Sequence, residues 1–431
     1  MKKPNIILFI THDQGQFIRC YNSEITPNAL NTPNLDKLAE KGIRFTNHFC
    51  TAPQCSPSRG SIQTSLYPHQ NGLMGLVNRG WNLPESNKTL PMYLHEQGYS
   101  THLIGLEHEA REVSTLGYES VSKRKSAQFY MLNRTEKLII QFLEDHSKDK
   151  KPFFLNIGAF EVHRPFELWN EPVNPKNVIV PSFLSDHEMV RKDLAQYYGV
   201  ISIVDEKIGK IQSKLEETDL MDDTLFIFTT DHGCPFPRAK CTLYDPGIKT
   251  SLIMNYSGSE LFSGGKVFDQ LVSNIDLLPS LIEFVSSKSV ANVEGKSFIP
   301  ILSQPAYSFR NEIYAEKSFH ELYDPMRCIR TDRFKYIHNF EKLETLYQLP
   351  LDIIKDPSGQ FVKDRIKIPR PERELYDLIN DPHEQVNLMA DSEYENVAKE
   401  LEDMLFNWLK RTNDPILRGK ILPQENVNFN Y

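Results

Sequence analysis

Short apolar runs alternate with amphipathic stretches along the first half of the chain. The runs "NIILFI", "THLI", "FFLNIGAF" and "LFIFTT" have the length and composition that are typical of buried strands. Between them, apolar residues at three- and four-residue spacing predict helices, and the clearest of these spans Leu194 to Leu215. Buried strands that alternate with helices predict an α/β fold with a large, mostly parallel central sheet flanked by helices.

The pattern changes near residue 310, where short strand-like stretches replace this alternation. The stretches "EIYAEKS", "RCIRTDRFKYIHNF" and "RELYDLI" are separated by turn-forming sequences. They predict a smaller antiparallel sheet, and the pattern from Tyr394 to Leu409 predicts a helix that packs on it. We therefore divide the chain into a large α/β domain, residues 1–310, and a smaller α+β subdomain, residues 311–431.

Polar residues follow the carboxyl ends of the four apolar runs. They are His12 and Asp13, His108, His163, and Asp231 and His232. Ligands of open α/β sheets bind outside the carboxyl ends of the strands, so we expect these side chains to meet there. Asp13 and Asp231 could converge on one hard cation, which prefers carboxylate oxygens. Taken singly, each aspartate fits a cap or turn role better than a metal-binding one.

The stretch "CSPSRGSIQTSLYPHQNG", residues 55–72, has helical spacing after its first residues. Cys55 should therefore lie at a helix N-terminus, where unpaired backbone N–H groups and the helix dipole favour an anion. Arg59, one turn later, adds a planar cation suited to an oxyanion. On these residues alone, Cys55 also fits the role of a small buried side chain, as most free cysteines do.

Cys-x-Pro-Ser-Arg at residues 55–59 resembles the signature of the sulfatase family. The segment around it is similar to the active-site segment of the heparan N-sulfatase (sulfamidase) group. Further stretches resemble the same family in the same order, from about Pro4 to Leu388: "PNIILFITHDQG", "GLEH", "TTDHGCPFPRAKCTLYDPG", "FHELYDPMR" and "RELYDLINDPHEQVNL". The resemblance implies the fold of the alkaline-phosphatase-like superfamily.

The resemblance also implies a nucleophile and a metal. Cys55 is expected to be oxidised to formylglycine by a maturation enzyme, and the formylglycine hydrate is the expected nucleophile. His12, Asp13, Asp231 and His232, with residue 55, match the metal ligands of the family, so we expect Ca²⁺ first and Mg²⁺ or Mn²⁺ behind it. Both histidines stand where the family usually has Asp or Asn, and imidazole is a poorer ligand for Ca²⁺ than oxygen.

Other site residues follow from the same resemblance. Arg59 would steady the hydrate, His108 would act as the base that lets sulfate leave, and His163 would protonate the leaving group. A histidine in the position of His163 would otherwise fit an ordinary loop residue.

Substrate contacts are expected from two more segments. Lys240 matches a sulfate-binding cation, whereas Leu106 stands where the family has a lysine that grips sulfate. His320, Glu321 and Arg327 resemble the substrate-pocket segment of the sulfamidase group, so the subdomain is expected to contribute to the pocket.

Charge and composition exclude several classes of protein. A net charge of −8 without a basic stripe argues against a nucleic-acid partner. The sequence has no apolar run of about 18 residues and no signal-peptide pattern at its start, so we expect a cytoplasmic protein without a membrane segment, or a periplasmic or secreted one if a leader was removed. Six cysteines in 431 residues do not indicate a disulfide framework.

The sequence thus predicts a sulfatase that hydrolyses a sulfamate or sulfate ester on an aminosugar. N-sulfoglucosamine from heparin or heparan sulfate fragments is the first expected substrate, as a mono- or oligosaccharide. An O-sulfatase acting on another sulfated sugar remains open, and a phosphate or phosphonate monoesterase fits less well. Leu106 and the two histidines of the metal site also leave open a non-catalytic, glycan-binding relative.

Overall fold

The computed structural model describes residues 3–22, 25, 28–122, 131–168, 172–304 and 306–427. Within them, nine strands form one sheet in the order β4-β3-β5-β1-β6-β7-β2-β8, and β9 pairs with β2. β7 runs antiparallel to its neighbours β6 and β2, and the other neighbours pair in parallel. The strands are β1 (Asn5–Thr11), β2 (Ile43–Phe49), β3 (Ser100–Gly105), β4 (Ser120–Val121), β5 (Phe153–Gly158), β6 (Thr224–Thr230), β7 (Lys249–Asn255), β8 (Lys266–Phe268) and β9 (Val272–Ser273).

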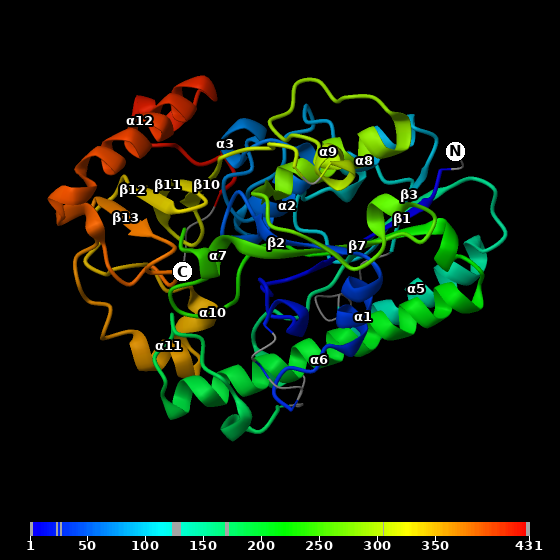
Figure 1. Cartoon of the computed structure of the whole chain (residues 1–431), viewed down its shortest axis with the longest axis horizontal. Coiled ribbons are helices and arrows are strands. Elements are labelled where there is room, and N and C mark those ends of the chain that lie inside the picture. Colours follow the sequence, from blue (N-terminus) through cyan, green and yellow to red (C-terminus); the bar gives the residue numbers. More distant parts are fainter. Residues whose placement is uncertain are drawn as a thin grey trace.

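Helices cover both faces of this sheet (Figure 1). On β1, the buried side chains of Ile6 and Leu8 pack in the cluster that contains α2, α4 and α8, whereas Ile7 and Phe9 pack with α1, α5 and α6. Side chains on a strand alternate between faces, so one apolar run serves both layers. The helices are α1 (Pro33–Lys41), α2 (Cys55–Thr64), α3 (Pro68–Asn71), α4 (Leu90–Glu96), α5 (Leu132–His146), α6 (Glu188–Glu217), α7 (Asp245–Ile248), α8 (Leu277–Ser286) and α9 (Ile299–Ser303).

A second, antiparallel sheet of four strands follows, in the order β10-β11-β12-β13. Its strands β10 (Glu312–Phe319), β11 (Tyr323–Thr331), β12 (Phe334–Asn339) and β13 (Arg373–Asp377) are accompanied by α10 (Leu351–Ile354), α11 (Pro357–Val362) and α12 (Glu395–Arg411). Leu405 and Trp408 of α12 pack on one face, and Ile248 of α7 packs on the other together with the preceding Leu243. Both the mostly parallel central sheet and the smaller sheet with its helix are therefore confirmed.

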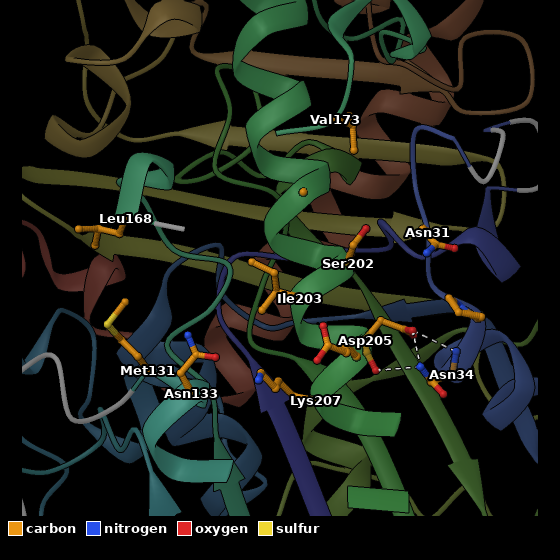
Figure 2. Close-up of a pocket in the computed structure, with 13 residues that line it drawn as sticks. Asn31, Asn34, Met131, Asn133, Leu168, Val173, Ser202, Ile203, Asp205 and Lys207 are labelled. Atoms are coloured by element: carbon orange, nitrogen blue, oxygen red, sulfur yellow. Dashed lines mark hydrogen bonds between the residues drawn. The ribbon is translucent and has the colours of Figure 1, made fainter. Parts of the chain in front are cut away.

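None of the described helices is long and apolar enough to cross a bilayer. A hollow of about 620 Å³ lies beside α1, α5 and α6, away from the predicted site residues (Figure 2). Within it, the carboxylate of Asp205 accepts hydrogen bonds from the backbone N–H of Leu35 and from Nδ2 of Asn34, each at 2.8 Å. Asp205 therefore serves to fix the start of α1.

Candidate functional site

Four adjacent strands deliver the predicted polar residues to one edge of the sheet. β3, β5, β1 and β6 are neighbours and run in parallel, so their carboxyl ends lie side by side. Asp13 adopts a left-handed backbone conformation (φ 56°), which short polar residues tolerate, and its N–H donates to Oδ1 of Asp231 at 2.9 Å. That bond ties the loop after β1 to the loop after β6.

The five residues expected to hold a metal come together at this edge. His12, Asp13, Cys55, Asp231 and His232 are all buried, and each offers a ligand atom within 4.8 Å of the others. Oδ1 of Asp13 lies 2.7 Å from Nδ1 of His12 and 2.9 Å from Nε2 of His232. Sγ of Cys55 lies 3.4 Å from Nε2 of His232. The structure thus places residues 13, 55 and 231 in one pit.

The orientation of the His232 ring indicates that the five clustered residues can bind a metal ion. Its Nδ1 lies 3.0 Å from the carbonyl oxygen of Gly233, so Nδ1 carries a proton and donates it. In the neutral ring, Nε2 then directs a lone pair at Oδ1 of Asp13, 2.9 Å away. Two facing lone pairs at this distance repel unless a proton on Nε2 or a metal ion lies between them. Two carboxylates and two imidazoles therefore provide a donor set for one divalent ion.

Charges in the pit keep both carboxylates ionised. Burial alone would raise the pKa of Asp13, but Lys240 and the surrounding histidines outweigh it and hold that pKa well below its usual value. Burial likewise opposes ionisation of Asp231, and His12, His232 and Arg59 lower its pKa in spite of it. Burial raises the pKa of Cys55 well above that of an ordinary thiol. The unmodified cysteine is thus a neutral thiol and a poor nucleophile.

Cys55 is the first residue of α2, as the sequence predicted. Gln54 precedes it with extended backbone angles, φ −146° and ψ 151°, and all ten residues of the helix are buried. Nε of Arg59 donates to Oδ2 of Asp231 at 3.1 Å, and Oγ of Ser58 donates to the carbonyl oxygen of the same residue. The helix that carries Cys55 is therefore fixed directly to the loop that carries Asp231.

A cavity of about 380 Å³ opens over this pit. Its lining includes Cys55, His108, His163, Lys240, His320 and Glu321. The volume lies in the range of small-ligand sites. The structure thus brings these predicted catalytic and substrate-binding side chains into one cavity.

Lys240 and His163 form a linked pair in this cavity. Nδ1 of His163 lies 2.5 Å from the carbonyl oxygen of Arg164 and donates to it, which leaves Nε2 to accept from Nζ of Lys240 at 3.3 Å. Burial and then the Lys240 charge lower the pKa of His163 to about 4. His163 is thus neutral in this state and must take up a proton before it can act as an acid.

Nζ of Lys240 also contacts two carboxylates. It lies 2.6 Å from Oδ2 of Asp13 and 2.7 Å from Oδ2 of Asp352. Asp13, His163 and Asp352 form a second group with metal-ligand spacing, and the lysine ammonium lies among all three. The ammonium of Lys240 therefore already supplies the positive charge that a metal ion would bring to these three side chains.

Two further histidines line the cavity with spare hydrogen-bonding capacity. Nδ1 of His108 and Nδ1 of His320 are both buried, and neither has a hydrogen-bond partner among the described residues. Burial, then neighbouring His12, lowers the pKa of His108 to about 3, and burial with Lys240 lowers the pKa of His320. Leu106 is buried at the end of β3 and brings no cation there.

The structure does not bring Arg327 to the cavity. Its guanidinium donates to both carboxylate oxygens of Asp414, at 2.6 and 3.1 Å, and to the carbonyl oxygen of Lys317 at 2.8 Å. The side chain is fully buried in the second sheet and does not line the cavity, so its contact with substrate stays a prediction. The sequence could not reveal this, because Asp414 lies 87 residues further along the chain.

Glu321 lines the cavity but also has a structural contact. Both of its carboxylate oxygens accept from the backbone N–H of Leu351, at 2.9 and 3.0 Å. Glu321 thus anchors the start of α10.

Replacing Arg327 with methionine should lower the free energy of unfolding by about 3 to 5 kcal/mol, because the carboxylate of Asp414 would stay buried without its partner. Urea unfolding measures this change, and KM for the substrate should stay the same. Arg373→Met is the matched control: Arg373 of the same sheet pairs with Glu402, and both side chains are partly exposed, so its loss should lower that free energy by less than about 1 kcal/mol. A raised KM with unchanged stability in Arg327→Met would support the substrate role.

Sequence reasoning missed Asp352, whose carboxylate lies in the cavity against Lys240 and His163. It also missed Arg79 and Lys355, two cations of the cavity lining. Asp352 is 112 residues from Lys240 and follows no strand end, so no local pattern marks it.

Comparisons with known proteins agree with this geometry. The profile of the sulfatase family matches residues 4–287, and the profile described as N-sulphoglucosamine sulphohydrolase, C-terminal, matches residues 238–368. The chain is 28% identical to N-sulphoglucosamine sulphohydrolase of Homo sapiens, covering 97% of this chain and 94% of that protein. It is 22% identical to N-acetylglucosamine-6-O-sulfatase of Bacteroides thetaiotaomicron, covering 98% and 89%.

Solved structures share the fold. One, in complex with its substrate D-glucosamine-2-N,6-O-disulfate, aligns with a TM-score of 0.73 and 22% identity over 97% of this chain and 100% of that one. The phosphonate monoester hydrolase of Agrobacterium radiobacter aligns with a TM-score of 0.73 and 19% identity over 98% and 99%.

Proposed function

Because the chain belongs to the sulfatase family, we propose that this hydrolase releases sulfate from a sulfated aminosugar, with N-sulfoglucosamine from heparin or heparan sulfate fragments as its preferred substrate. The C-terminal profile of the sulfamidase group supports this choice, since it covers the segment that contains Lys240, His320 and Glu321. The sugar class is supported by the similarity to N-acetylglucosamine-6-O-sulfatase and to a solved structure whose substrate is a glucosamine with both N- and O-sulfate.

We propose that His12, Asp13, Asp231 and His232 hold one divalent cation, with Ca²⁺ first and Mg²⁺ or Mn²⁺ as alternatives. When bound, this ion would offset negative charge on the sulfate oxygens. Formylglycine, made from Cys55 by a maturation enzyme, would supply the oxygen nucleophile that a buried neutral thiol cannot.

Side chains of the cavity would bind the sulfate group and transfer the protons. Lys240 would hold sulfate oxygens, replacing the lysine that is absent at Leu106. His163, once protonated at Nε2, would give its proton to the leaving nitrogen, because an amine leaves poorly without one. His108, whose pKa of about 3 keeps it neutral, would accept a proton when sulfate is released.

The single observation that carries the proposal is the position of Cys55. It begins a buried helix, lies within the cluster of carboxylates and imidazoles, and also lines the cavity that contains His163 and Lys240. A nucleophile formed at residue 55 would therefore face the substrate site.

Inorganic sulfate release from N-sulfoglucosamine and from glucosamine 6-sulfate tests this function. The protein should be produced with a maturation enzyme, and we expect the higher kcat/KM with the N-sulfated sugar. A preference for the 6-sulfate would establish the O-sulfatase alternative. Binding of both sugars without sulfate release, by protein that carries formylglycine, would support the glycan-binding alternative.

A further inference from the structure

Asp352 is an acidic side chain that the C-terminal subdomain contributes to the cavity, and its position is fixed. It lies in α10, whose first backbone N–H donates to the carboxylate of Glu321 at 2.9 and 3.0 Å. Oδ2 of Asp352 lies 2.7 Å from Nζ of Lys240 and 3.6 Å from Nε2 of His163. The carboxylate is therefore held beside the residue that would protonate the leaving group.

The carboxylate of Asp352 also has unused accepting capacity. A carboxylate can accept about four hydrogen bonds, yet Oδ1, which is buried, has no hydrogen-bond partner among the described residues. The side chain is 21% exposed and lines the cavity. Burial raises its pKa, but Lys240 and His163 outweigh burial and keep the pKa below its usual value. The group is thus an ionised acceptor, unable to donate.

Sulfamates and sulfate esters differ at the atom that leaves with the sugar. In a sulfamate the leaving nitrogen carries a hydrogen, whereas the bridging oxygen of a sulfate ester carries only lone pairs. An ionised carboxylate accepts a bond from the first and repels the second. A site built around a buried hydrogen-bonding group discriminates strongly against an analogue that leaves the group unpaired.

We propose that Asp352 is a specificity-determining residue that selects sulfamates over sulfate esters by accepting a hydrogen bond from the N–H of the leaving nitrogen. The inference rests on the proposed function, because it requires a substrate whose leaving atom lies next to His163. The same bond would turn the lone pair of the nitrogen toward His163, which must deliver a proton to it. Asp352 thus orients the leaving group as well as selecting it.

The test compares Asp352→Asn with the wild-type enzyme, both carrying formylglycine and supplied with the divalent ion. The substrates are N-sulfoglucosamine and glucose 2-sulfate, which has an ester oxygen in place of the N–H at the same ring position. The variant should lose roughly 10- to 100-fold in kcat/KM with N-sulfoglucosamine. With glucose 2-sulfate, kcat/KM should stay the same or rise, because the asparagine amide can donate to the ester oxygen.

Two controls separate selection from general damage. Asp356→Asn removes another acid of the cavity lining, whose Oδ2 lies 2.6 Å from Nη1 of Arg164, and it should leave the ratio of the two kcat/KM values unchanged. Hydrolysis of 4-nitrophenyl sulfate, whose leaving group needs no proton, should persist in Asp352→Asn and would report that Lys240 is still in place.

The outcomes are distinct. Suppose that the wild-type enzyme prefers the sulfamate. If Asp352→Asn keeps that preference, or if its kcat/KM falls equally with both sugars and with the aryl sulfate, the inference is overturned and the proposed function stands. If the wild-type enzyme itself prefers glucose 2-sulfate or hydrolyses neither sugar, the proposed function fails, and the inference fails with it.

Discussion

Cys55→Ala should abolish sulfate release, with a loss of kcat on the order of 10⁴-fold or more, as is typical when a covalent nucleophile is removed. Cys55 is the one cysteine of the metal-ligand cluster, and the described lining of the cavity includes no other thiol and no hydroxyl side chain. The substitution removes only Sγ from a buried position, so the fold should persist. Steady-state sulfate release on N-sulfoglucosamine measures the loss.

Cys20→Ala is the matched control for the loss of a thiol. Cys20 is half-buried, takes no part in the cluster and should tolerate alanine with full turnover. Thermal unfolding of both variants would show that neither has lost its fold. Substantial turnover in a folded Cys55→Ala variant would mean that residue 55 is not the nucleophile.

Removal of the divalent ion should have the second-largest effect. Chelation followed by desalting should lower kcat by about 10³-fold, since a Lewis-acidic ion supplies several kcal/mol of charge stabilisation. The melting temperature should fall as well, because an ion at about 100 times its Kd stabilises the folded state by about 2.7 kcal/mol. Without the ion, Asp13 and Asp231 keep their charges in a buried pit.

Adding Ca²⁺ should restore turnover and the melting temperature together, and titration calorimetry should show one bound ion. Asp231→Asn should bind Ca²⁺ far more weakly, whereas Asp186→Asn, an exposed acid paired with Arg191, should bind it like the wild type. Restoration by Mn²⁺ but not Ca²⁺ would show that His12 and His232 shift the preference of the site. Full turnover after complete ion removal would contradict the metal role.

Local patterns in the sequence predicted the elements that position the site. The apolar runs that start at Asn5, Thr101, Phe153 and Leu225 correspond to β1, β3, β5 and β6. A buried strand can be predicted locally, because its own residues form a short continuous apolar run. The polar residues after them met at one edge, since parallel neighbours align their carboxyl ends. The start of α2 at Cys55 was readable in the same way.

Contacts between distant segments could not be predicted. The pairs Arg327–Asp414 and Lys240–Asp352 join residues 87 and 112 positions apart, and no periodicity records such a pairing. The antiparallel insertion of β7 beside β6 is likewise a property of the assembled sheet. For this reason the sequence could not show that Arg327 lies buried against Asp414, and it gave no sign of Asp352.

Peptide mapping of residue 55, coupled to sulfate release from the same preparations, tests the central claim most directly. Preparations that differ in exposure to a maturation enzyme should show a kcat proportional to the fraction of formylglycine at position 55, reaching zero when every copy is cysteine. A preparation in which Cys55 is entirely unmodified but which releases sulfate at the full rate would contradict this account.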